Sequence, residues 1–124
     1  RRTRIAQIES ILKRIKRLPL GKGLNSPIIC GDFNTGSKAF SDAVRQFMIR
    51  SAQHVQYTYH PQNERTFPAH FPSRGLDFVL APKPYKVSAA RAIKSFASDH
   101  LPVLIELSAP SNAKKLETKV SSFI

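Results

Sequence analysis

The sequence predicts a single α/β domain in which helices pack on strands. Apolar residues recur at spacings of three and four near the N-terminus, a pattern typical of an amphipathic helix. Further along they gather in short runs rich in β-branched residues, which are typical of buried strands. The expected order is a helix, a strand, a second helix and then roughly three or four strands, which suits a mixed α/β layer structure.

The first helix is expected over residues 2–18. Its apolar stripe consists of Ile5, Ile8, Leu12 and Ile15. Its opposite face is basic and carries Arg4, Arg14, Lys16 and Arg17. A basic amphipathic helix can contact a membrane surface or nucleic acid, but we favour the simpler interpretation of a surface helix docked on a sheet.

The central strand is expected within residues 27–35, where the apolar run ends in a Gly-Asp-Phe-Asn sequence. A second helix should follow from about residue 39 to residue 50 and bury Phe40, Val44 and Phe47. The remaining elements are strands at 55–59, 76–80, 85–93 and 101–107, a long loop at 60–74 and a turn at 82–84. The domain should therefore occupy residues 1–107, with a flexible tail at 108–124.

The charge balance is the unusual feature of the composition. The 124 residues include 20 Lys+Arg and 8 Asp+Glu, a net charge of +12, while the apolar share of 41% is ordinary. The positive electrostatic potential of such a chain favours a polyanion or an anionic membrane surface as partner. A basic surface without a specific partner is the alternative.

Cys30 is the only cysteine, so the chain cannot form an internal disulfide. A single thiol within an apolar strand is expected to be a small buried hydrophobe. No apolar run approaches the roughly 20 residues of a membrane-spanning helix, and the first residues do not resemble a signal peptide. The compartment stays open, with the cytoplasm slightly favoured.

Two polar residues follow the central strand. Asp32 and Asn34 are two positions apart, so both side chains should point to the same side of the strand. We expect them to converge on one ligand at the carboxyl end of this strand. The alternative is a turn in which Asp32 only satisfies local backbone amides.

Asp77 and His100 are predicted to be partners. A carboxylate within the apolar strand at 76–80 carries a large desolvation cost unless it is paired, and His100 directly precedes another buried strand. A hydrogen bond between them would satisfy both groups and fix the imidazole tautomer. Asp32 and Asp99 would then be free to bind Mg²⁺ or Mn²⁺. A buried polar network that merely ties strand ends together is the alternative.

Three motifs in this order resemble the endonuclease/exonuclease/phosphatase superfamily, which includes DNase I-like nucleases. They are Gly31-Asp32-Phe33-Asn34, then Arg74-Gly75-Leu76-Asp77-Phe78-Val79-Leu80, then Ser98-Asp99-His100. Arg4, Gln7 and Ile8 of the first helix, and Thr66-Phe67-Pro68 of the long loop, are further familiar features. The resemblance covers nearly all of residues 1–107.

The resemblance implies part of a two-sheet α/β sandwich, with a mixed sheet, flanking helices and a metal-dependent phosphoesterase site at one edge. It implies that Asp32 positions or deprotonates the attacking water and that Asn34 orients water and phosphate. It further implies that Asp77 holds His100 against the scissile phosphate, and that Asp99 lies near the metal.

The chain departs from the family in one respect. Full family members carry an Asn and a metal-binding Glu on earlier strands, and neither Glu9 nor Glu64 occupies a matching place. We therefore expect this chain to be the C-terminal part of the domain, with weak metal binding and little catalysis on its own. It should need the upstream half, because apolar surface would otherwise be exposed where that half packs.

Three functions remain open. A phosphate-ester hydrolase acting on nucleic acid is preferred because of the charge of +12. A lipid or inositol-phosphate phosphatase or a sphingomyelinase is the second, because anionic head groups also suit a basic surface. A non-catalytic basic module that binds nucleic acid is the third.

Overall fold

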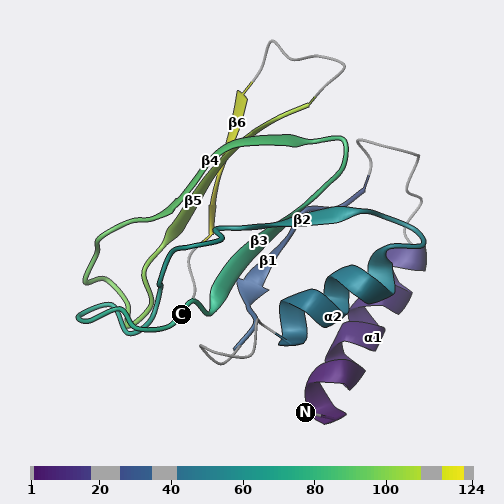
Figure 1. Cartoon of the computed structure of the whole chain (residues 1–124), viewed down its shortest axis with the longest axis horizontal. Coiled ribbons are helices and arrows are strands. Elements are labelled where there is room, and N and C mark those ends of the chain that lie inside the picture. Colours follow the sequence, from purple (N-terminus) through teal and green to yellow (C-terminus); the bar gives the residue numbers. More distant parts are fainter. Residues whose placement is uncertain (1, 18–25, 35–41, 110–115, 122–124) are drawn as a thin grey trace.

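The computed structural model describes residues 2–17, 26–34, 42–109 and 116–121. Its helices are α1 (Arg2–Arg17) and α2 (Asp42–Ser51). Its strands are β1 (Ile29–Asp32), β2 (Tyr57–His60), β3 (Asp77–Pro82), β4 (Lys86–Ala92), β5 (Val103–Ser108) and β6 (Leu116–Ser121). They form two antiparallel sheets, ordered β1-β3-β2 and β4-β5-β6 (Figure 1). The fold class is therefore mixed α/β, as predicted.

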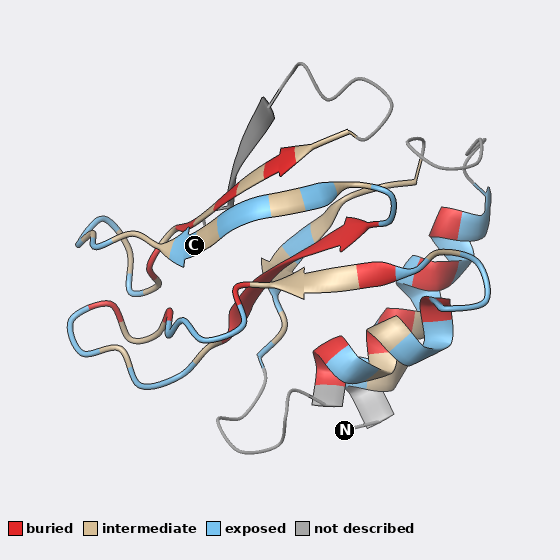
Figure 2. Ribbon diagram, turned by 45° about the horizontal axis from the view of Figure 1, so that its top comes forward, coloured by how far each residue is buried: buried red, intermediate tan, exposed pale blue. Residues whose placement is uncertain are grey.

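The three layers are helices, first sheet and second sheet, and β3 lies at their centre. Side chains of a strand alternate between its two faces, so β3 can serve two cores at once. Phe78 and Leu80 belong to the cluster shared with the helices, whereas Val79 belongs to the cluster formed with β5. All six residues of β3 are consequently buried (Figure 2).

The helices pack through the apolar faces predicted from the sequence. α1 buries Ile8, Leu12 and Ile15, and α2 buries Val44 and Phe47. The Phe47 ring meets the Tyr57 ring of β2 edge-on, with centroids 5.6 Å apart. These contacts fix both helices on the same face of the first sheet.

The first strand is not the buried strand that we predicted. Within the described residues β1 pairs only with β3, so it forms an edge of the sheet, and its residues alternate between intermediate and exposed. The Cys30 thiol is exposed, so the prediction of a buried cysteine is wrong. The reason is that an apolar run predicts a strand but does not reveal how many neighbours cover it. The prediction of a mixed sheet is also wrong, because every described strand pairing is antiparallel.

The end of the chain departs from prediction as well. Leu116–Ser121, within the expected flexible tail, form β6 and pair with β5. The β-branched residues Thr118 and Val120 favour a strand, and β5 offers an edge with which the segment pairs. The predicted Phe40 contact and the rest of the tail lie outside the described residues. No helix in the described part of the chain is long and apolar enough to cross a membrane.

Candidate functional site

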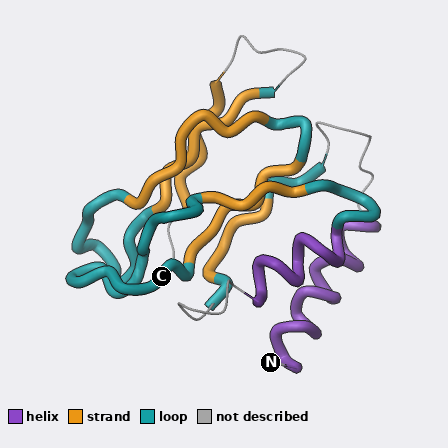
Figure 3. Tube along the Cα trace, in the orientation of Figure 1, coloured by secondary structure: helices purple, strands orange, loops and turns teal. Residues whose placement is uncertain are grey.

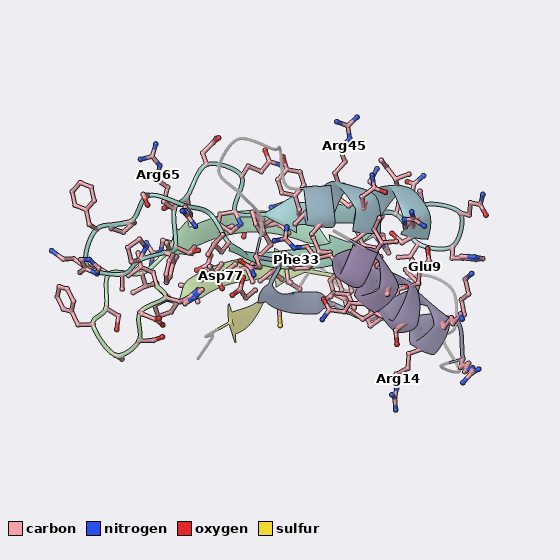
Figure 4. The ribbon with its side chains drawn as sticks, turned by 90° about the horizontal axis from the view of Figure 1, so that it is seen from below. Glu9, Arg14, Phe33, Arg45, Arg65 and Asp77 are labelled. Atoms are coloured by element: carbon pink, nitrogen blue, oxygen red, sulfur yellow. The ribbon has the colours of Figure 1, made fainter. Side chains whose placement is uncertain are left out.

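The antiparallel pairing of β1 and β3 brings two carboxylates together. Asp32, the last residue of β1, lies directly opposite Asp77, the first residue of β3. Asp77 is completely buried, while the Asp32 side chain is 37% exposed. Figure 4 shows Asp77 inside the molecule, whereas Arg14, Arg45 and Arg65 point outward. The carboxyl-end rule for parallel sheets does not explain this proximity; the register across an antiparallel pair does.

His100 bridges these two acids. Its Nδ1 atom lies 2.8 Å from Oδ2 of Asp77, which confirms the predicted hydrogen bond. Its Nε2 atom lies 3.9 Å from Oδ2 of Asp32. The imidazole is only 12% exposed and therefore faces Asp32 from a fixed position.

Thr66 contacts the same carboxylate oxygen of Asp77. Its hydroxyl accepts hydrogen bonds from the backbone N–H of Leu76, at 3.1 Å, and of Asp77, at 3.3 Å. The hydroxyl proton is thus directed to Oδ2 of Asp77, 2.5 Å away. If Asp77 is ionised, Nδ1 of His100 must carry a proton to donate to it. The Nε2 atom is then the ring nitrogen that faces Asp32 and can contact a ligand.

The conformation of Asn34 orients Asp32. Its backbone N–H donates to Oδ1 of Asp32 at 2.7 Å, and its φ of 48° lies in the left-handed region that Asn tolerates better than most residues. Asp32 therefore does satisfy a local backbone amide, as the alternative of a turn predicted. It leaves Oδ2 of Asp32 directed at His100, so the local turn and the site are compatible.

Burial and neighbouring charges shift the pKa values of Asp77 and His100. Desolvation raises the pKa of the Asp77 carboxyl, although hydrogen bonds from Thr66 and His100 oppose the shift. Burial alone would lower the pKa of His100, but the hydrogen bond to Asp77 and the negative charges of Asp77, Asp32 and Asp99 outweigh it and raise that pKa. The site therefore favours an imidazolium, a group suited to contacting an anion.

Two loops hold the imidazole in place. The loop between β2 and β3 is joined to the segment before β5 by the bonds from Ala69 N–H to Asp99 O and from Leu101 N–H to Thr66 O, both 2.7 Å. The Phe67 ring packs on the His100 ring, with centroids 4.7 Å apart. The sequence singled out Thr66 and Phe67 only as a familiar motif, and their roles as supports were missed because the loop has no periodicity.

Three ligand atoms, one each from Asp32, Asp77 and His100, lie within 4.8 Å of one another. Asp99 is not part of this group: its side chain is exposed and its Oδ1 lies 3.3 Å from the Ser98 hydroxyl. The predicted metal-binding pair of Asp32 and Asp99 therefore stays a prediction. Within this group of three only Asp32 offers an exposed carboxylate, which fits an ion that keeps most of its waters, as Mg²⁺ does.

A cavity of about 150 Å³ lies beside this site. It is lined by residues of α1, β1 and α2, mainly apolar, together with Arg4, Gln7 and Asp32. Asp32 therefore belongs both to the polar cluster and to this cavity. We assign no separate ligand to it.

A comparison of the chain with family models, curated proteins and solved structures finds no match. The functional argument therefore depends on the geometry of the site and on the motifs in the sequence.

Proposed function

We propose that this chain carries the phosphate-handling residues of a metal-dependent phosphodiesterase of nuclease type. The observation that supports it most strongly is the arrangement of Asp77, His100 and Asp32, in which a buried carboxylate holds an imidazole against an exposed carboxylate. A merely structural pair would not need the third, solvent-accessible acid. Arrangements with perturbed pKa values at a surface opening are typical of catalytic sites.

Each residue has a distinct role in this proposal. The imidazolium of His100 binds a non-bridging oxygen of the scissile phosphate, because its positive charge is stabilised by Asp77. Asp32 positions the attacking water and accepts its proton. Asn34 orients water and phosphate through its carboxamide. Attack of the water oxygen on phosphorus then breaks the ester bond on the opposite side, and the released alkoxide takes a proton from solvent.

Mg²⁺ or Mn²⁺ is the proposed cofactor, and Asp32 is the residue that would hold it. Such an ion is commonly bound through one or two carboxylates, with the substrate phosphate as a further ligand. It would supply Lewis-acid polarisation of the phosphoryl oxygen. A single exposed carboxylate implies weak binding, and the role of Asp99 near the ion stays a prediction.

The substrate favoured by the charge of +12 is nucleic acid. The same motifs support a DNase I-like two-sheet sandwich and membership of the endonuclease/exonuclease/phosphatase superfamily as part of this proposal. On that basis full activity would require the upstream half of the domain. Lipid or inositol-phosphate esters are the second candidate substrates, because basic side chains also attract anionic head groups.

The test is hydrolysis of bis-(p-nitrophenyl) phosphate and plasmid DNA with Mg²⁺ or Mn²⁺. It should compare this chain with a longer form that includes upstream residues from its gene. Metal-dependent hydrolysis that is lost in Asp32→Ala and His100→Ala supports the proposal. DNA binding without hydrolysis in either form would instead identify a non-catalytic basic module.

A further inference from the structure

The two most exposed large apolar side chains of the described residues both lie on loops at the site. Phe71 and Phe96 are each 76% exposed, compared with 55% for Ile49 and 41% for Ile11. Exposure of large apolar rings to water is unfavourable, so two such rings on neighbouring loops point to a surface that contacts a partner.

The loops that carry these rings lie side by side. Phe71 belongs to the loop between β2 and β3, and Phe96 to the segment between β4 and β5. The hydrogen bonds of Ala69 with Asp99 and of Leu101 with Thr66 join them, and Figure 3 shows both at the end of the molecule away from the helices. The same two segments carry Thr66, which contacts Asp77, and His100, so both rings lie on segments that also support the site.

The two loops that carry the rings are basic in composition. The exposed charged residues of the two loops and the adjoining end of β4 are Arg65, Arg74, Arg91 and Lys94, against Glu64 and Asp99. This excess complements a polyanion. Rings interleaved with cations are typical of surfaces that bind single-stranded nucleic acid, where each ring stacks on one base and the cations contact phosphates.

We propose that Phe71 and Phe96 stack on unpaired bases of a nucleic acid strand whose phosphate enters the site. This inference rests on the proposed function and assigns its substrate class as single-stranded or locally unpaired nucleic acid. Membrane insertion is less well supported, because Ser95, Ser98 and His70 interrupt the apolar residues and an interfacial segment needs a continuous apolar face. Two separated rings are sufficient for stacking.

The chain contains no tryptophan, which permits a direct test. Phe71→Trp and Phe96→Trp each introduce a single tryptophan, which can be excited selectively over the three tyrosines, and Ile49→Trp provides a matched exposed control on α2. The titrant is oligothymidylate, with EDTA present to prevent hydrolysis. We expect quenching in both loop variants and none in the control. Unchanged fluorescence in the loop variants would overturn the proposal.

Substitutions that remove the ring separate stacking from hydrophobic insertion. Phe71→Ala and Phe96→Ala should each weaken oligothymidylate binding by about 5- to 100-fold. Phe96→Leu should behave like the alanine variant, because leucine is apolar but cannot stack. Retained DNA affinity in Phe96→Leu would contradict stacking. So would a blue shift of the Phe96→Trp fluorescence on phosphatidylglycerol vesicles without quenching by DNA.

The small substrate distinguishes this inference from the proposed function. Bis-(p-nitrophenyl) phosphate carries no nucleobase and no neighbouring nucleotides, so in the longer form Phe71→Ala and Phe96→Ala should hydrolyse it at a rate close to that of the wild type. Quenching by DNA without hydrolysis in any form would support the aromatic surface while refuting the phosphodiesterase. Hydrolysis without quenching would leave the phosphodiesterase standing and refute the aromatic surface.

Discussion

Nδ1 of His100 lies 2.8 Å from Oδ2 of Asp77, a residue with no surface exposed to solvent. The hydroxyl of Thr66 contacts the same oxygen, whereas Oδ1 has no hydrogen-bond partner among the described residues. A buried carboxylate with one oxygen unsatisfied is unfavourable for stability. The pairing of this carboxylate with an imidazole that faces an exposed acid therefore comes at a cost in stability.

Thr66→Val should destabilise the fold by about 1–3 kcal/mol, because it leaves two buried backbone N–H groups and Asp77 without the hydroxyl. Thr66→Ser keeps the hydroxyl and serves as the control. Urea unfolding followed by circular dichroism measures both. Equal stability of Thr66→Val and Thr66→Ser would show that the hydroxyl does not hold Asp77.

The pKa of His100 should lie above its ordinary value of 6.5 in the folded chain. Because the folded pKa is raised, the stabilisation from His100 is fully present below pH 6.5 and is lost as the pH rises through the folded pKa. The difference in free energy of unfolding between the wild type and His100→Gln should accordingly shrink as the pH rises from 6.5 through the folded pKa. NMR titration of the imidazole gives the midpoint, which Asp32→Asn should lower. A difference that grows with pH would contradict this assignment.

Phe47→Ala should destabilise the fold by about 3–5 kcal/mol, since Phe47 is completely buried between the helices and the first sheet. Ile49→Ala on the same helix is the control. Ile49 is 55% exposed, so its truncation should change stability by no more than about 0.5 kcal/mol. Thermal or urea unfolding measures both, and comparable losses would mean that the helix packs differently.

The ion pair between Glu9 of α1 and Arg50 of α2 should contribute little. Both side chains are partly exposed, 46% for Glu9 and 35% for Arg50, and exposed pairs are typically worth about 0.2–1 kcal/mol. A double-mutant cycle with Glu9→Gln and Arg50→Gln should give a coupling energy in that range that falls with added salt. A coupling that is unaffected by 1 M salt would argue against a screened surface pair.

The parts of the site predicted from the sequence are those that follow from local chemistry. Asp77 and His100 could be paired in advance because each is a polar residue beside an apolar strand and each requires a partner. The helix faces followed from periodicity alone. In contrast, the contact of Thr66 with Asp77 depends on the course of the loop between β2 and β3, and the sequence of that loop has no periodicity from which its course could be predicted.

Long-range relationships account for the remaining differences. The proximity of Asp32 to Asp77 comes from the antiparallel register of β1 and β3, which we did not predict from the sequence. The exposure of Cys30 follows from the position of β1 at an edge of the sheet. Both depend on which strands become neighbours, a property that an apolar run does not encode.

Steady-state hydrolysis of bis-(p-nitrophenyl) phosphate by the longer form with Mn²⁺ tests the central claim most directly. It should be measured for the wild type, Asp77→Asn, His100→Gln and the double variant. We predict that each single substitution lowers kcat by about 10²- to 10⁴-fold. The double variant should lose little more, because residues that act as one unit are not additive. Unaltered hydrolysis in the single variants, or no metal-dependent hydrolysis in the wild type, would contradict a phosphodiesterase site at Asp77 and His100.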